Sequence, residues 1–335
     1  MKIIFTLLMI NWFSATVCIA QYIDSSDFRR PDSIASLYKG HSLDDLRLLS
    51  HKLTASLSTE KEQFRAIFSW VCNNISNDYS YYEKNKSKRE KLLHQPEKLA
   101  RWNREFRVKV FDRLRNDYTT VCSGYAYLIR ELAYYAGIEC EIVDGYGRTA
   151  QANIGGEPVA NHSWNTVKIN KKWYLCDATW SSGSVDPQQK AFISTFSEAY
   201  FLTDPSMFVL NHYPLDTSKL YLKIKPSLAS FMKAPLVYKG AIQQKVKPIM
   251  PETFLAFAEK NQPKHFVFKS VANEEIKDLK LQIYFAGKYT NISPEVSVNA
   301  DGLLSVEYIF KSKGSYLVHI MNGADYLFTY KIAVK

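Results

Sequence analysis

The sequence predicts an α+β chain, with helices and a β-hairpin in its first two thirds and an all-β C-terminal part. Three observations support this class. Apolar residues recur at helical spacing in the stretches 42–57, 59–75 and 122–136. A hairpin pattern occupies 161–180. Short alternating segments separated by glycine-containing turns fill 265–334, which is typical of a β-sandwich.

The first twenty residues have the pattern of a secretory signal peptide. A lysine precedes an apolar run that ends at Ala20, and Cys18 and Ala20 are the small residues at −3 and −1. We therefore expect residues 1–20 to be cleaved near Ala20, which makes the mature chain secreted, periplasmic or part of the cell envelope. A membrane anchor and a lipidated Cys18 are the alternatives. The run is short for a membrane span, and Val17 is a poor residue before a lipidated cysteine.

Two amphipathic helices open the mixed domain, which we expect over 21–225. Ser42 and Thr59 each stand three residues before an acidic side chain, the spacing of a capping box. We interpret both helices as core scaffolding. Their apolar stripes are Leu46, Leu49, Leu53 and Leu57 in the first, and Phe64, Ile67, Phe68, Val71 and Ile75 in the second.

The segment 84–115 is unusually basic. It holds twelve Lys or Arg and four Asp or Glu, a net charge of +8 against +10 for the whole chain. Pro96 suits the first turn of a helix, and an amphipathic helical insertion with a basic outer face is predicted. An acidic polymer, a membrane surface or an acidic protein substrate fits that face. Nucleic acid does not, because the chain is expected to be exported. A solvated face without a partner is the alternative.

Cys122 lies at the predicted start of the third helix. Thr119 or Thr120 is the expected cap, and Gly137 ends the helical pattern as a C′ glycine. The unpaired N–H groups and positive dipole of a first helical turn favour a thiolate at Cys122. A small buried core cysteine is the alternative.

A β-hairpin is predicted to bring His162 and Asp177 together. With Asn170 and Lys171 as a two-residue turn, paired residue numbers sum to 341 and Trp164 faces Asp177. His162 and Asp177 are then diagonal neighbours on one face, roughly 7 Å apart at the backbone. A loop one residue longer would place them on opposite faces, so the prediction depends on this register.

These three residue types are those that activate a nucleophile. Cys122 would attack a carbonyl carbon, His162 would hold its proton and pass it to the leaving amine, and Asp177 would orient the imidazole.

Several ordered blocks between about 60 and 215 carry a family resemblance. They are Val-Cys-Ser-Gly-Tyr-Ala at 121–126, Ala-Gly-Ile-Glu-Cys at 136–140, Asp-Gly-Tyr-Gly-Arg at 144–148, Asn-His-Ser-Trp-Asn at 161–165 and Lys-Trp-Tyr-Leu-Cys-Asp-Ala-Thr-Trp at 172–180. The chain resembles the transglutaminase-like superfamily, and within it bacterial relatives of the kyphoscoliosis peptidase branch. The resemblance implies a papain/transglutaminase-like core, in which the Cys-bearing helix packs on an antiparallel sheet. It also implies the catalytic roles of Cys122, His162 and Asp177.

Four further residues are candidates for the oxyanion site or for substrate binding. In this superfamily a residue upstream of the cysteine can help to form the oxyanion site, so Tyr79 and Tyr81 are candidate hydroxyl donors. Packing of these tyrosines in the core is the alternative. Trp164 and Arg148 are candidate substrate contacts, although Arg148 equally suits a structural ion pair.

Four cysteines remain after the expected cleavage. Cys140 and Cys176 both lie on predicted strands, so a disulfide between them is open, with two separate buried thiols slightly favoured. No cluster of Cys and His has metal-ligand spacing, so we expect no metal, and no cofactor is implied.

The C-terminal part, expected over 226–335, is predicted to be a β-sandwich of immunoglobulin-like type that begins within 225–260. It shows no catalytic cluster in its sequence and suits substrate positioning or protein binding.

The predicted function is that of an exported cysteine enzyme acting on amide bonds of proteins or peptides. A peptidase or amidase is preferred, and a protein cross-linking transglutaminase comes second. The alternatives are an exported scaffold without turnover and a basic surface adhesin that works through 84–115.

Overall fold

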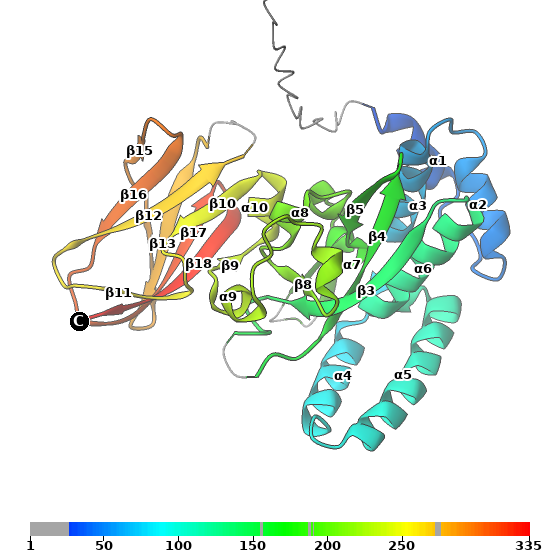
Figure 1. Ribbon diagram of the computed structural model, residues 1–335, viewed down its shortest axis with the longest axis horizontal. Coiled ribbons are helices and arrows are strands. Elements are labelled where there is room, and N and C mark those ends of the chain that lie inside the picture. The colour runs from blue at the N-terminus through cyan, green and yellow to red at the C-terminus, as the bar shows by residue number, and fades with distance from the viewer. Residues whose placement is uncertain (1–26, 155–156, 187–188, 190, 272–275) are drawn as a thin grey trace, which may run out of the picture.

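The computed structural model describes residues 27–154, 157–186, 189, 191–271 and 276–335 (Figure 1). The expected signal peptide at 1–20 lies outside the described residues. One half of the molecule combines helices with a small sheet, and the other half is built from strands (Figure 1). This arrangement confirms the α+β class. Among the described helices, none is both long and apolar enough to cross a membrane.

Three helices form the scaffold behind the small sheet: α1 (Arg29–Leu37), α2 (Leu46–Thr54) and α3 (Glu60–Asn74). The predicted apolar stripes of α2 and α3 are buried, except that Leu46 at the start of α2 is half-buried. Thr59 forms the expected capping box with Glu62, but α2 is capped by Asp45, because Ser42 bonds to Asp44 instead. Helix α1 was not expected, since its sequence has no clear apolar stripe; Asp32 on α1 pairs with the buried Arg65 of α3.

The central sheet has the strand order β5-β4-β3-β8 and is antiparallel throughout. Its strands are β3 (Cys140–Gly147), β4 (His162–Ile169), β5 (Lys172–Cys176) and β8 (His212–Pro214). Asn170 and Lys171 both have positive φ, 50° and 65°, as a two-residue type I′ hairpin turn requires. Ile169 pairs with Lys172, which confirms the predicted register.

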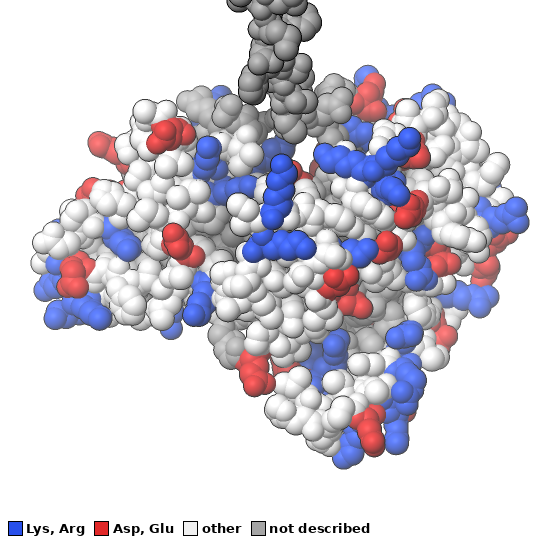
Figure 2. All heavy atoms as spheres, viewed as in Figure 1, with Lys and Arg blue, Asp and Glu red and all other residues white. Residues whose placement is uncertain are grey.

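The basic segment is a pair of helices, α4 (Tyr79–Lys91) and α5 (Pro96–Asp117). The helical insertion predicted over 84–115 is present, but it is a pair of helices with wider bounds, and the pair projects away from the sheet (Figure 1). Pro96 is at the start of α5 as expected, and the buried side chains of this helix are Phe106, Val110 and Leu114. Lys and Arg side chains are present on the projecting pair and elsewhere on this face (Figure 2).

Short elements connect the central sheet to the C-terminal half. They are α7 (Ala178–Ser182), β6 (Gly183–Asp186), β7 (Ala191–Ser194), η1 (Glu198–Tyr200), α8 (Pro205–Phe208), η2 (Thr217–Leu220), α9 (Leu228–Lys233) and α10 (Lys239–Gln243).

The C-terminal half contains two sheets that pack on each other. One has the order β10-β12-β16-β15, and the other has the order β11-β18-β17-β13-β14 with β9 paired to β18. Phe268 on β12 and Phe328 on β18 meet between them, with ring centroids 6.2 Å apart. The strands are β9 (Leu236–Val237), β10 (Val246–Met250), β11 (Leu255–Ala258), β12 (Pro263–Ser270), β13 (Leu279–Phe285), β14 (Lys288–Ile292), β15 (Val296–Val298), β16 (Leu303–Ile309), β17 (Gly314–Asn322) and β18 (Asp325–Val334).

The apolar core of the C-terminal half continues beneath the central sheet. Trp164 of β4 and Phe208 of α8 belong to the same buried cluster as Phe266 and Phe328. Burial of this shared surface stabilises the contact between the halves.

Candidate active site

Cys122 is the first residue of α6 (Cys122–Tyr135), as predicted, but the cap differs from the expectation. Thr119 and Thr120 form the short strand β2, which pairs with β1 (Ser76–Asn77), so neither caps the helix. The N-cap is Val121, which offers no side-chain hydrogen bond. The first-turn N–H groups are therefore not capped by a side chain of that residue and face the same region as the thiol.

Gly124 allows the close approach of β2 to this helix. A Cβ at Gly124 would lie 1.8 Å from Oγ1 of Thr120, a distance that no packing tolerates. The glycine thus places the start of α6 directly against β2. Tyr125, the next residue, is buried and donates its hydroxyl to the carbonyl of Ile75 at 2.7 Å, which ties the helix to α3.

His162 is the first residue of β4 and is buried, with only 7% of its surface exposed. Its Nε2 atom donates to Oδ2 of Asp177 at 2.8 Å. Trp180 stacks on the imidazole with ring centroids 5.0 Å apart. On the neighbouring strand, a Cβ at Gly147 would lie 3.1 Å from both His162 and Trp180, so the bare backbone makes room for both rings.

Asp177 is held by donors on both of its carboxylate oxygens. Its position differs slightly from the expectation, because β5 ends at Cys176 and Asp177 is the N-cap of α7 rather than a ladder partner of Trp164. Oδ1 accepts from the backbone N–H groups of Thr179 and Trp180 at 2.8 and 3.3 Å. Burial alone would raise the pKa of Asp177, but the imidazoles that face Oδ2 hold it well below its usual range.

The electrostatics favour a charged imidazole at His162. Burial alone would lower the pKa of His162, but Asp177 and the thiol of Cys122 raise it to about 10. Nε2 is engaged with Asp177, which leaves Nδ1 for the interaction with Cys122. A charged imidazole beside a thiol at a helix N-terminus favours the thiolate form. The structure therefore brings together the three residues that the sequence singled out.

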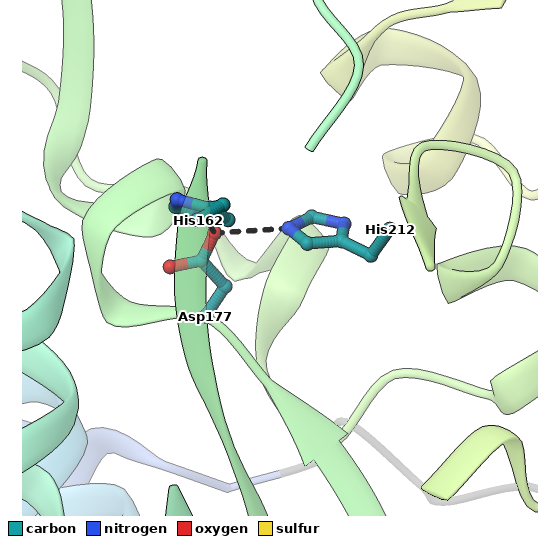
Figure 3. A group of neighbouring side chains, drawn as sticks. All are labelled: His162, Asp177 and His212. Carbon is teal, nitrogen blue, oxygen red and sulfur yellow. Dashed lines mark hydrogen bonds and ion pairs between the residues drawn. The ribbon is translucent and has the colours of Figure 1, made fainter. Parts of the chain in front are cut away.

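His212 is a fourth member of the site that the sequence reasoning did not assign to it. Its Nε2 lies 3.1 Å from Oδ2 of Asp177, the oxygen that His162 also contacts (Figure 3). The side chain is buried, and burial lowers the pKa of His212 to about 4, so it is neutral near pH 7. The one signal in the sequence is that the segment His212-Tyr213-Pro214 also resembles the family branch described above, because β8 joins the sheet from a distant part of the chain.

Of the tyrosines before the Cys helix, the structure places Tyr79 and Tyr82 at the cleft and Tyr81 away from it. Tyr81 stacks on Phe106 with centroids 4.6 Å apart, so its hydroxyl is no candidate for the oxyanion site. Burial and the charge of the nearby Cys122 thiol raise the pKa of Tyr82, and a hydrogen bond with Asn161 offsets part of this effect. Tyr82 is thus the tyrosine beside the thiol, and Tyr79 stacks on it.

Trp164 and Arg148 differ in their relation to the cleft. Trp164 is fully buried, with its ring 6.0 Å from that of His162 and 5.1 Å from that of His212. It therefore supports the two imidazoles from within the core and does not touch the cleft. Arg148 lines the cleft, and it makes no ion pair with any described carboxylate, which corrects the structural ion pair considered for it.

The thiol opens onto a cleft of about 290 Å³ between α4, the central sheet and the start of the C-terminal half. Cys122, His162 and Trp180 line one side of it, and Tyr82, Asn161 and Arg148 lie among its other walls. This volume suits a few residues of an extended polypeptide.

Cys72, Cys122, Cys140 and Cys176 are all free thiols, so the disulfide left open between Cys140 and Cys176 is not formed. His162, Asp177 and His212 have the donor types of a metal site, within 4.8 Å of one another. The sequence spacing did not reveal this group. Both imidazoles share Oδ2 of Asp177 through hydrogen-bond distances, so the arrangement is that of a hydrogen-bonded relay.

The fold and the site define a papain-like arrangement, with a thiol at a helix start beside an imidazole and a carboxylate on an antiparallel sheet. Residues 47–178 match the family model of the transglutaminase-like superfamily, so this part of the chain is similar to a transglutaminase-like domain.

Among curated proteins, the human kyphoscoliosis peptidase is 30% identical over 214 residues, which cover 62% of this chain and 29% of that protein. Hillarin of Drosophila melanogaster is 27% identical over 127 residues, 34% of this chain and 16% of that protein. The chain thus spans less than a third of these relatives. A solved structure titled as that of a TGase is similar with a TM-score of 0.28 and 15% identity, over 54% of this chain and 40% of that one.

Proposed function

We propose that the protein is an exported cysteine enzyme that acts on amide bonds of proteins or peptides through an acyl-enzyme on Cys122. One observation carries this proposal: the buried His162 lies between Asp177 and the Cys122 thiol, at the edge of an open cleft. A structural role alone does not call for a charged imidazole beside a thiol on a solvent-accessible wall.

The mechanism follows from the positions of the side chains. The Cys122 sulfur attacks the carbonyl carbon of the substrate, and the negative charge moves to the carbonyl oxygen. The backbone N–H groups at the start of α6 and the Tyr82 hydroxyl are close to the thiol and are the candidate donors to that charge. His162 then gives its proton to the leaving amine, and the C–N bond breaks. Water attacks the thioester with His162 as the base, which releases the acid and the free thiol.

The same acyl-enzyme can pass its acyl group to a lysine amine, and this is the second candidate. We prefer hydrolysis because the curated relative of highest identity given above carries the name peptidase. The choice depends on whether water or an amine reaches the thioester first. A scaffold that retains the site without turnover is the alternative from another class.

We also propose that the basic helix pair α4–α5 attracts an acidic protein substrate. Tyr79, Tyr82 and Lys86 of α4 line the cleft, so this helix of the pair forms one of its walls. A charged surface that adjoins a cleft raises the local concentration of an oppositely charged substrate. An acidic polymer or a membrane surface would be attracted by the same charge, and export from the cell is proposed from the leader pattern alone.

The test measures the alkylation rate of each cysteine in the folded protein between pH 5 and 9, with the sites assigned by mass spectrometry. Cys122 should react fast at pH 6, and the His162→Ala variant should lose this reactivity. Cys72 and Cys176 are fully buried and serve as internal controls. If Cys122 reacts no faster than an ordinary thiol, the enzyme hypothesis is wrong and the scaffold hypothesis gains support.

A further inference from the structure

Arg148 is a buried cation at the catalytic cleft that lacks an anionic partner. It follows β3 directly, and its backbone N–H donates to the carbonyl of Asn211, the neighbour of His212. Only 3% of its surface is exposed, yet it lines the same cleft as Cys122. No described carboxylate pairs with it, and burial lowers the pKa of Arg148 to about 10 without an opposing effect of an acidic group.

The contacts of Arg148 satisfy only part of its guanidinium. Nη1 donates to the carbonyls of Phe231 at 2.8 Å and Pro235 at 3.3 Å, and Nε donates to that of Asn153 at 3.3 Å. These bonds tie the central sheet to the segment that leads into β9. Nη2 is buried and has no hydrogen-bond partner among the described residues.

A structural role explains the hydrogen bonds of Nη1 and Nε, but it explains neither the buried positive charge nor the unpaired Nη2. A neutral donor would cap the same carbonyls without the cost of burying a charge. An unpaired buried donor also costs free energy, which is recovered when an acceptor arrives. The guanidinium geometry matches a carboxylate, which can accept two parallel hydrogen bonds.

The other charged side chains of the cleft also favour an anionic ligand. Besides the charged imidazole of His162, the cleft contains three Lys or Arg residues, which are Lys86, Arg148 and Lys239, and one acidic residue, Glu83. Lys86 is tethered through Nζ to the carbonyl of Gln151 at 3.0 Å, on the loop that follows Arg148. Of these cations, Arg148 is the one held inside the protein with a free donor.

We propose that Arg148 binds a carboxylate of the substrate in the cleft beside Cys122. This inference rests on the proposed function and narrows its substrate class to peptides that carry a carboxylate close to the reacting bond. That group is either the free C-terminus or an acidic side chain.

The experiment measures protection of Cys122 from iodoacetamide by small peptides, with labelling read by mass spectrometry. The probes are N-acetyl-Ala-Ala with a free C-terminus, its C-terminal amide, and N-acetyl-Ala-Asp-Ala amide, each at millimolar concentrations. We expect a carboxylate-bearing peptide to protect at concentrations about tenfold or more below those of the neutral amide. Protection by the first probe alone identifies the C-terminal carboxylate, and protection by the third identifies the side chain.

Two variants locate the effect. Arg148→Gln should remove the preference for carboxylates, whereas Lys233→Gln, which removes an exposed charge on the adjacent α9, should keep it. Arg148→Lys retains the charge and should retain part of the preference if the glutamine variant folds poorly. Equal protection by acids and amides in the unchanged protein, or none by any probe, would show that Arg148 is structural only. The unprotected rate and its dependence on His162 report separately on the proposed function.

Discussion

Asp177 and His212 are joined by a contact of 3.1 Å between Oδ2 and Nε2, in a part of the protein where both side chains are buried. The same oxygen accepts the hydrogen bond from His162, so His212 helps to fix the carboxylate that orients the catalytic imidazole. Both ring nitrogens of His212 are engaged, Nδ1 with Asn211 and Nε2 with Asp177, so we interpret His212 as a positioning residue.

The first prediction concerns this positioning role. His212→Gln should reduce the alkylation rate of Cys122 at pH 6 by about tenfold. This is less than the rate contribution of a residue that transfers the proton itself, because His212 acts only through Asp177. The pH profile of the Cys122 alkylation rate separates a positioning role from a loss of structure. The midpoint of this profile should move, while the circular dichroism spectrum remains that of the native protein. An unchanged rate and profile would remove His212 from the site.

A second prediction concerns the carboxylate itself. Asp177→Asn keeps an oxygen for the backbone N–H groups of Thr179 and Trp180, so α7 should remain capped. It removes the charge that stabilises the imidazolium of His162. The alkylation rate of Cys122 at pH 6 should fall by roughly a hundredfold, and the difference in rate between the variant and the unchanged protein should shrink above pH 9. Asp45→Asn, at the cap of α2, is the control and should leave the rate unaltered.

A third prediction uses two neighbouring tyrosines of α4. Tyr82→Phe should slow acylation of Cys122 by p-nitrophenyl acetate by about tenfold to a hundredfold, because a donor to the developing oxyanion is lost. Alkylation of Cys122 by iodoacetamide should be unchanged in this variant, since that reaction develops no oxyanion. Tyr81→Phe is the matched control, because its ring packs on Phe106. A Tyr82→Phe variant with normal acylation would contradict the role of the hydroxyl.

The fourth prediction concerns stability and pH. The folded-state pKa of His162 is raised to about 10, above the unfolded value near 6.5. Its stabilising contribution is therefore complete below pH 6.5 and is lost as the pH rises towards 10. For His212 the pKa is lowered to about 4, so stability falls as the pH drops from 6.5 to 4. Urea unfolding should show the highest stability near pH 6.5, and His162→Gln should flatten the alkaline side.

The fifth prediction tests the packing at the start of α6. Gly124→Ala should lower the free energy of unfolding by about 1–3 kcal/mol, since its Cβ would collide with Thr120. Thr120→Ala should restore part of this loss in the double variant, because it removes the hydroxyl that lies closest. Additive effects of the two substitutions in urea unfolding would contradict a direct clash.

Binding through the basic helix pair can be tested in the same protein. Replacing the exposed Arg101, Arg104 and Arg107 of α5 by Gln should weaken binding to polyglutamate at low salt, and salt should weaken it further. Replacing Lys288, Lys311 and Lys313 in the C-terminal half removes the same charge and is the control. Equal losses in both variants would indicate a net-charge effect only.

Much of the site was predictable because it depends on features that lie close together in the sequence. The two-residue turn at Asn170-Lys171 set the strand register, and the register brought His162 next to Asp177. Cys122 was placed at a helix start by the apolar spacing that follows it and by Gly137 at the helix end. The detailed caps were less predictable, because Thr120 could serve equally as a cap or as a strand residue, and pairing with β1 decided the matter.

The sequence by itself determined the α+β class, the Cys, His and Asp at the site and the register that joins two of them. These depend on periodicity and on a short turn, whose energies act over a few residues. Only the tertiary structure decided that Tyr82 rather than Tyr81 faces the thiol, because α4 is polar all round and its rotation is set by packing on α5. The tertiary structure also decided the positions of His212 and Arg148. His212 reaches the site because β8 pairs with β3, and Arg148 is held by the carbonyl of Phe231 on α9, which lies far from it in the sequence.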